Sequence, residues 1–454
     1  MSNQSIISNN TLTTKEKYRH TIPFRIDFIK KLLNNNELKP MINFDNTETD
    51  NFVNNKDDSE DSQKSYDTRL SLNKKMHDFA SIINQMGGKL EYIKSGTTGH
   101  TFKGNSIGQN GEELNYAVKV VAYPKKEKYG NIYDSRRPEN AELMMIKLLS
   151  YFVVKKQTPH IVLPIGTFNA GIQIFVDLIE QDVVNKNEDQ RYMEFIKRYK
   201  NGEYYDDVSI LISEWANKGD LLDFIRKNYK QFKLIHWKVF FFQIISTLAV
   251  IQSKFPAFRH NDMKANNILV HKIDKTKNKF AYRVERHYYT VPNIGYFIKL
   301  WDFDFACVPG LVENSKVSSE WTKAINVIPE KNRYYDMHYF FNTLIRKGFF
   351  PQFMTEDCIP TEAKEFVNRI VPNKYRDGKY VHKRGRILIQ DEYLTPDTVL
   401  KTDPFFEAFR KQTSPHKSIS KTIKSKPKKK RTKKREQSLD DIDNIKLEDL
   451  LRES

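Results

Sequence analysis

Three polar residues in the second half of the chain have the types and spacing that phosphoryl transfer requires. Asp262 and Asn267 stand five residues apart in HNDMKANNILV, and Asp302 follows 35 residues later in IKLWDFDFA. A carboxylate can orient an attacking hydroxyl and accept its proton, whereas an amide oxygen and a second carboxylate can hold Mg²⁺. Asp262 suits the first role, and Asn267 and Asp302 suit the metal-binding roles.

The elements around these residues form a strand-rich block followed by a helix-rich block. LEYIKSGTTGHTFKG and LNYAVKVVAY are typical of strands around a glycine-containing turn, and SILISEWA is a later strand. Helical periodicity is present in ENAELMMIKLLSYFV and in HWKVFFFQIISTLAVIQSKF. This order predicts an α+β fold in two lobes, a small β-rich lobe followed by a larger α-helical lobe.

Two further motifs precede the polar residues. SGTTGHTF contains Gly96 and Gly99, and YAVKV contains Lys119. Together with Asp262 and its neighbours, they give residues 88 to 410 a chain order that resembles the eukaryotic-type protein kinase superfamily. The resemblance implies a bilobal kinase fold that binds ATP. The two glycines would let backbone N–H groups approach the phosphates, and the lysine would hold the α- and β-phosphates.

The same resemblance assigns residues to the rest of the nucleotide site. Glu142, in ENAELMMIKLL, is the expected helix partner of the strand lysine, with Glu139 as the alternative. ISEWANKGDLLDFI looks like the hinge, where Glu214 to Ala216 would meet the adenine through the backbone. Asp220 would lie near the ribose.

Residues near the catalytic loop indicate the kind of kinase. Lys264 is similar to the lysine that contacts the transferring γ-phosphate in serine/threonine protein kinases. RYYDMHYFFNTLI resembles the large-lobe helix whose aspartate, here Asp336, braces the catalytic loop. Combined with WDFDFA, it most resembles the kinases of large DNA viruses, of the poxvirus and giant-virus kind. The implied activity is phosphorylation of Ser or Thr in protein substrates, with ATP and Mg²⁺ as cofactors.

Lys94, which stands where the glycine loop usually has its first glycine, and two substitutions in the large lobe leave alternatives open. Asn261 stands where the family usually has an arginine that binds activation-segment phosphate, and Asp304 stands where a glycine usually follows the metal-binding aspartate. We therefore expect activity without phosphorylation of that segment, and a rate nearly unchanged when its hydroxyls at Ser315, Ser318, Ser319 and Thr322 are removed. The alternatives are a small-molecule kinase of the aminoglycoside or choline type on the same core, and a weakly active pseudokinase scaffold.

Composition divides the chain into four parts. Residues 1–85 are rich in Asn, Asp and Ser, and we expect them to be disordered. Residues 86–213 form the predicted small lobe and residues 214–410 the large lobe. Residues 411–454 form a basic tail and a short acidic amphipathic segment.

The basic tail carries most of the excess charge. The formal net charge is +18, and residues 411–436 contribute twelve Lys and Arg against one Glu, which leaves +7 elsewhere. The segment from Lys411 to Arg435 could contact a polyanion, either nucleic acid or an anionic membrane, could direct the protein to a nucleus, or could be a solvated tail that aids solubility. The basic balance therefore concerns tethering rather than catalysis.

Other features of the sequence exclude several classes of protein. Two cysteines, Cys307 and Cys358, cannot build a disulfide framework or a four-thiolate zinc site. The polar start lacks the apolar stretch of a signal peptide, and the apolar run 239–251 is too short and too interrupted to cross a membrane. We expect a monomeric protein of the cytoplasm, with polar surface loops at 182–207 and 271–296.

Overall fold

The computed structural model describes residues 74, 76–85, 89–107, 113–181, 183–185, 189–317 and 319–410. All of them belong to one compact unit, residues 1–411. Most of the predicted N-terminal extension and the basic tail lie outside the described residues. One part of that extension, Phe79–Gln85, forms helix α4, so the prediction of disorder is wrong there. Its side chains of Phe79, Ile82 and Ile83 are buried, because the folded small lobe supplies an apolar surface for them.

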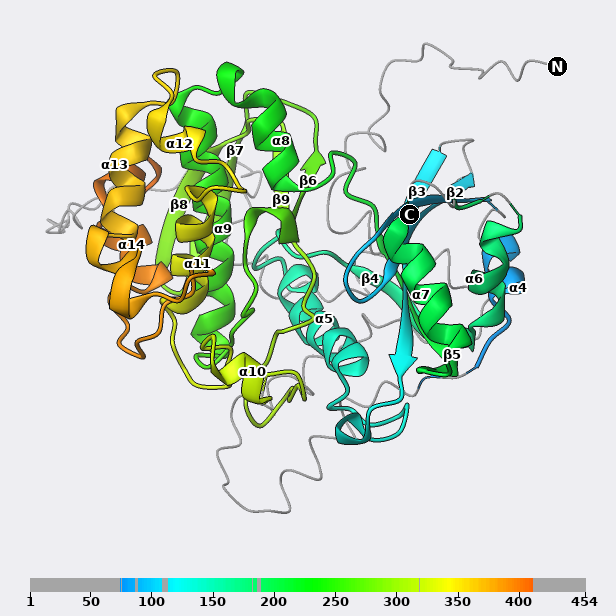
Figure 1. Cartoon of the computed structure of the whole chain (residues 1–454). Helices are drawn as coiled ribbons and strands as arrows, with labels where there is room; N and C mark the ends of the chain where they lie inside the picture. Colours follow the sequence, from blue (N-terminus) through cyan, green and yellow to red (C-terminus); the bar gives the residue numbers. More distant parts are fainter. Residues whose placement is uncertain are drawn as a thin grey trace, which may run out of the picture. The chain divides into compact units, whose positions relative to one another are not determined.

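A five-stranded antiparallel sheet forms the small lobe, in the order β1-β2-β3-β5-β4 (Figure 1). Thr101 lies opposite Lys119, and Phe102 lies opposite Val118, so these two pairs face opposite sides of the sheet. The lysine side faces Glu142 and Asp302, and the phenylalanine side faces Phe175 in an added layer of helices. The strands are β1 (Lys89–Ser95), β2 (His100–Ile107), β3 (Glu113–Pro124), β4 (Pro164–Gly171) and β5 (Tyr204–Glu214).

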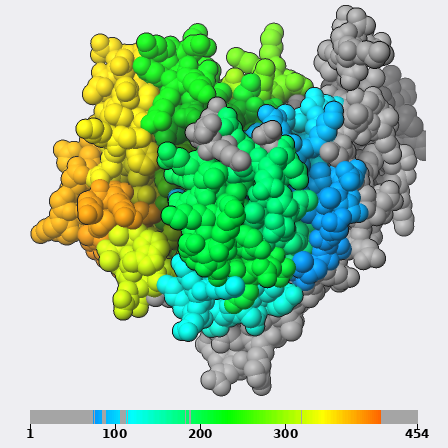
Figure 2. Space-filling view, turned by 45° about the vertical axis from the view of Figure 1, so that its right-hand side comes forward, coloured from blue at the N-terminus to red at the C-terminus, as the bar shows by residue number. Residues whose placement is uncertain are grey.

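The insertion between β4 and β5 forms this added layer. It contains α6 (Gln173–Val176) and α7 (Gln190–Lys200), which lie beside α4 and the sheet (Figures 1 and 2). The expectation of a surface loop at 182–207 is therefore wrong. Tyr192, Phe195 and Ile196 have the i, i+3, i+4 spacing of one helix face, but charged neighbours conceal this short stripe in the sequence. The stripe becomes a core face because the outer side of the sheet is available to bury it.

The helices of the large lobe surround α9 (Leu234–Lys254), which contains the predicted apolar run. By length and composition α9 could cross a membrane, but its apolar side chains are packed in the core of the lobe. The other helices are α5 (Pro138–Val154), which belongs to the small lobe, and α8 (Leu221–Asn228), α10 (Glu320–Lys323), α11 (Tyr335–Leu344), α12 (Gln352–Thr355), α13 (Thr361–Ile370) and α14 (Pro396–Thr402). The predicted α+β fold in two lobes is confirmed.

Two small sheets complete the large lobe. β6 (Ile268–Lys272) pairs with β9 (Tyr296–Leu300), and the polar insertion between them folds back as a hairpin of β7 (Lys279–Val284) and β8 (His287–Pro292). The hairpin is not a simple surface loop, because Tyr282 and Tyr289 are buried against Phe242 of α9.

Candidate active site

The β6–β9 pair brings the two predicted polar motifs together. Ile268 lies opposite Leu300, so the catalytic loop that ends at Asn267 lies beside the segment that begins at Trp301. Asp336, at the start of α11, accepts hydrogen bonds from the backbone N–H groups of His260 at 2.7 Å and Asn261 at 2.9 Å. This buried carboxylate therefore braces the catalytic loop from below, as the resemblance implied.

The Asp262 carboxylate is held by three side chains. Lys264 Nζ lies 2.9 Å from Oδ2, and Asn267 Nδ2 donates to the same oxygen at 2.9 Å. The guanidinium of Arg386 donates to Oδ1 at 2.6 Å and to the carbonyl oxygen of Asn261 at 3.2 Å. Charge-assisted hydrogen bonds of this kind are short and strong, so they fix the orientation of the carboxylate.

Sequence reasoning did not predict the contact of Arg386. This residue lies more than a hundred positions after the catalytic loop, in a segment without a motif, and only the fold brings it to the carboxylate. Its side chain is buried and packs over the ring of Tyr339, with the guanidinium carbon 4.2 Å from the ring centroid. Burial of so large a cation requires a partner, and the carboxylate of Asp262 provides it.

A second charged cluster connects the two lobes. Lys119 Nζ lies 2.6 Å from Glu142 Oε1 of α5 and 3.1 Å from Asp302 Oδ1. The alternative partner, Glu139, instead pairs with Arg137 at 3.1 Å. Burial alone would lower the pKa of Lys119, but the two carboxylates outweigh it and raise the pKa, so the amine remains charged.

The residues proposed as metal ligands present suitable oxygen atoms. Asn267 directs its Nδ2 to the carbonyl and carboxylate oxygens of Asp262, which leaves its Oδ1 as the atom that can bind a cation. Asp302 adopts a left-handed φ of 60°, and its side chain remains 34% exposed. Burial raises the pKa of this carboxyl, but Lys119 outweighs that effect and lowers it, so Asp302 is ionised. A carboxylate and an amide oxygen fit Mg²⁺, which prefers oxygen ligands.

The glycine loop forms a tight turn at the end of β1. The N–H of Gly96 donates to the carbonyl of Gly99 at 2.7 Å. A Cβ atom on Gly99 would lie 2.6 Å from the carbonyl oxygen of Val120, so only glycine fits there. α7 supports the loop from outside: Arg191 donates to the carbonyl of Ser95, and His100 packs on Tyr192.

The predicted hinge residues follow β5. Glu214 is the last residue of the strand, and its carboxylate lies 2.8 Å from Lys299 Nζ, while Ala216 is buried. Asp220 caps α8 by accepting a hydrogen bond from the N–H of Asp223 at 3.0 Å. The carboxylate of Asp220 also lies 3.9 Å from Lys94 Nζ, across from the glycine loop.

The two substitutions noted in the sequence have structural partners. Asn261 donates to the carbonyl of Phe305 at 3.0 Å, so its amide holds the beginning of the activation segment. Asp304 accepts from Lys316 of the same segment at 2.6 Å, and both side chains are nearly buried. Asp304 thus forms an ion pair within the activation segment, a contact that sequence reasoning did not predict.

Comparisons with known proteins agree with this geometry. Residues 125–383 match the poxvirus serine/threonine protein kinase family. A protein of Acanthamoeba polyphaga mimivirus named as a serine/threonine-protein kinase is 49% identical over 411 residues, covering 88% of this chain and 83% of the relative. The chain belongs to the poxvirus serine/threonine protein kinase family. A second mimivirus protein with that name is 29% identical over 189 residues, covering 37% of this chain and 46% of the relative.

Membership of this family confirms the resemblance to kinases of large DNA viruses. The protein is a serine/threonine protein kinase, and the family match includes Lys264, Asn267 and the activation segment. The matched range ends at residue 383, so Arg386 lies just beyond it. The contact between Arg386 and Asp262 is therefore known from the structure of this chain and not from the family match.

Proposed function

We propose that this kinase transfers the γ-phosphoryl group of ATP to Ser or Thr hydroxyls of protein substrates in a Mg²⁺-dependent reaction. The observation that carries the proposal is the placement of the Asp262 carboxylate between Lys264 and Arg386. The Lys119–Glu142–Asp302 cluster belongs to the same site. Together these groups provide a base, a phosphate-binding cation and a metal-binding carboxylate.

In this mechanism Asp262 orients the substrate hydroxyl and accepts its proton as the oxygen–phosphorus bond forms. The bond between the γ-phosphorus and the β,γ-bridging oxygen breaks, and ADP leaves. Lys264 stabilises negative charge on the transferring phosphoryl group, and Lys119 positions the α- and β-phosphates. Asn267 and Asp302 would hold Mg²⁺, which would supply positive charge against the phosphates of the nucleotide. Catalysis therefore consists mainly of positioning and electrostatic stabilisation.

Gly96 and Gly99 would cover the phosphates, and the backbone from Glu214 to Ala216 would bind the adenine. Asp220 is proposed to face the ribose. Its contact with Lys94 supports a site enclosed from both sides, because one residue belongs to the large lobe and the other to β1. Because Asn267 and Asp302 are the proposed ligands of Mg²⁺, removal of Mg²⁺ should weaken ATP binding without unfolding the protein.

Radiolabelled ATP tests the proposal most directly. The purified kinase is incubated with Mg²⁺ and a mixture of acidic and basic protein substrates, with Asp302→Ala as the control. We expect labelled Ser and Thr in the wild-type lanes alone. Asp262→Ala should also abolish labelling yet leave ATP binding largely intact. Equal labelling by wild type and Asp302→Ala would overturn the proposal, and transfer to aminoglycosides or choline alone would indicate a small-molecule kinase.

The remaining proposals concern partners and location. We propose a monomeric kinase of the cytoplasm whose tail, from Lys411 to Arg435, contacts a polyanion or supports nuclear import. Counterion release makes charge-driven binding to nucleic acid steeply salt-dependent. Deleting the tail should abolish such binding, and an unchanged affinity for duplex DNA or anionic vesicles would contradict the proposal. Microscopy of the tail deletion checks the location.

A further inference from the structure

Positive charge is concentrated in one segment between α13 and α14. Residues 374–386 contain six Lys and Arg and one Asp. The charge is also accessible, because most of these cations are exposed and only Arg386 is buried. The six cations are Lys374, Arg376, Lys379, Lys383, Arg384 and Arg386.

This segment lies beside the catalytic base. Arg386 contacts Asp262 directly at 2.6 Å. The residues that follow it run along the end of the activation segment, where the side chain of Asn326 donates to the carbonyl of Ile387 at 2.6 Å. The side chain of Asn332 donates to the carbonyl of Ile389 at 3.1 Å. The segment therefore forms part of the surface that surrounds the acceptor position.

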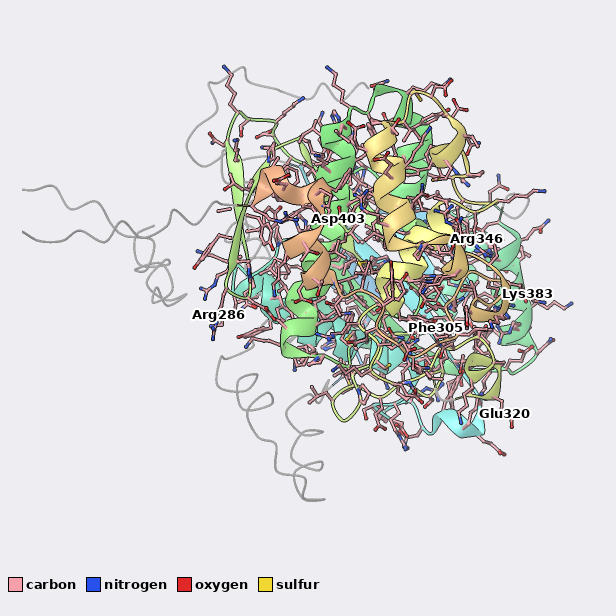
Figure 3. The ribbon with its side chains drawn as sticks, turned by 90° about the vertical axis from the view of Figure 1, so that its left-hand side faces the viewer. Arg286, Phe305, Glu320, Arg346, Lys383 and Asp403 are labelled. Atoms are coloured by element: carbon pink, nitrogen blue, oxygen red, sulfur yellow. The ribbon has the colours of Figure 1, made fainter. Side chains whose placement is uncertain are left out.

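A tight turn presents two of the cations. Val381 and Ile387 form a β-bridge, and residues 382–385 close the turn with a hydrogen bond from the N–H of Gly385 to the carbonyl of His382. Arg346 braces the turn by donating to the carbonyl of Lys383 at 3.0 Å, and both residues lie at the same edge of the large lobe (Figure 3). Lys383 and Arg384 are exposed at the tip. We refer to residues 382–385 as the basic turn.

The charges at the tip are not neutralised within the described residues. No acidic side chain in that part of the chain lies within 4.0 Å of the Lys383 amine or the Arg384 guanidinium. These charges also affect the neighbouring histidine. Burial lowers the pKa of His382, and the positive charges of Arg384, Lys383 and Arg386 lower it further. An anion from another molecule would relieve this repulsion.

We propose that the basic turn binds an acidic or phosphorylated residue of the protein substrate, so that this kinase selects Ser and Thr in acidic sequences. The inference rests on the proposed phosphotransfer at Asp262. Two or three residues, each spanning at most about 3.6 Å, separate the tip from Arg386. An extended substrate whose hydroxyl meets Asp262 would reach the tip with a side chain about two to four residues from the acceptor.

Matched peptides test the inference. Each contains one Ser, with Ala, Asp or phosphoserine placed two to four residues before or after it, and kcat/KM is measured for each. We expect at least one acid-flanked peptide to exceed the alanine peptide in kcat/KM about 2- to 30-fold, the range for one or two exposed ion pairs, mainly through a lower KM. The Asp and phosphoserine peptides distinguish a carboxylate from a phosphate as the preferred anion.

Two double variants identify the surface responsible. Lys383→Ala/Arg384→Ala should reduce kcat/KM for the acid-flanked peptides to the value for the alanine peptide. The kcat/KM for the alanine peptide itself should be unchanged. The control, Lys279→Ala/Arg286→Ala, also removes one exposed lysine and one exposed arginine, but from the β7–β8 hairpin. Arg286 lies at the opposite edge from Lys383 (Figure 3). This control should retain the preference.

The outcomes separate the inference from the proposed function. If no peptide or protein is phosphorylated above the level of Asp302→Ala, the proposed function itself fails. If peptides are phosphorylated without an acidic preference, or if the preference survives in Lys383→Ala/Arg384→Ala, phosphotransfer stands and the role of the basic turn is overturned.

Discussion

The ion pair between Asp304 and Lys316 gives a quantitative prediction about the activation segment. The Lys316 amine lies 2.6 Å from Asp304 Oδ1, and the two side chains are only 13% and 10% exposed. Burial lowers the pKa of Lys316, but Asp304 outweighs this effect and raises it, so the amine is charged. We infer that this pair holds the activation segment without a phosphate.

The distance sets the size of the expected effect. Two unit charges at that separation attract by about 6 kcal/mol at an effective dielectric constant of about 20, and desolvation of both ions offsets much of this. Lys316→Met keeps the length of the side chain but leaves the Asp304 carboxylate buried without its partner. Loss of one member of a buried pair typically costs about 3–5 kcal/mol.

Hydrogen exchange measured by mass spectrometry reports this loss locally. A cost of about 3–5 kcal/mol should accelerate exchange of peptides from residues 311–327 by about two to four orders of magnitude. The control is Lys323→Met, which removes an exposed charge from the same segment and should change exchange little. Peptides from α9 should exchange as in the wild type in both variants.

A double-mutant cycle decides whether loss of the Asp304–Lys316 ion pair causes the faster hydrogen exchange. Asp304→Asn/Lys316→Met removes both charges, so its exchange should be slower than the two single effects added together predict. Exchange in Lys316→Met within tenfold of the wild type would refute the reasoning, and so would strict additivity in the cycle.

Three further predictions concern the base, the activation segment and pH. Arg386→Ala should lower kcat about 10- to 100-fold with little change in KM for ATP, because Asp262 loses one of its fixed hydrogen bonds; a kcat within twofold of the wild type in steady-state assays would contradict this. Ser315→Ala and phosphatase treatment should each leave the rate within about twofold. Ser319 and Thr322 are kept, because their hydroxyls donate to the carbonyl of Lys316 at 2.9 Å and 2.7 Å and alanine there would disturb the segment itself. Burial lowers the pKa of His338 from 6.5 to about 4, so its stabilising effect is complete above pH 6.5 and is lost as the pH falls toward 4. Urea unfolding should therefore show about 2 kcal/mol less stability at pH 5 than at pH 7.5 from this group, a difference that His338→Gln should remove.

The sequence by itself determined the order of the lobes and the identity of most candidate site residues. Asp262, Asn267 and Asp302 could be predicted from the sequence, because phosphoryl transfer constrains residue type and spacing along a short stretch of chain. The resemblance to protein kinases implied Lys119 and a helix partner, and helical periodicity favoured Glu142 over Glu139. The distance of 2.6 Å between Lys119 and Glu142 agrees with that choice. Local patterns of this kind survive in the sequence because they lie within single elements.

The tertiary structure decided the features that depend on contacts between distant segments. The stripe at Tyr192, Phe195 and Ile196 is too short to predict a packed helix until the outer face of the sheet is present to cover it. Arg386 reaches Asp262 because the segment after α13 folds back along the activation segment. Two residues in such a contact need no fixed separation in the sequence. The loops between them can differ in length and path while the two side chains still meet. The contacts that hold the Asp262 carboxylate and the position of the basic turn are therefore properties of the fold, although every residue involved is visible in the sequence.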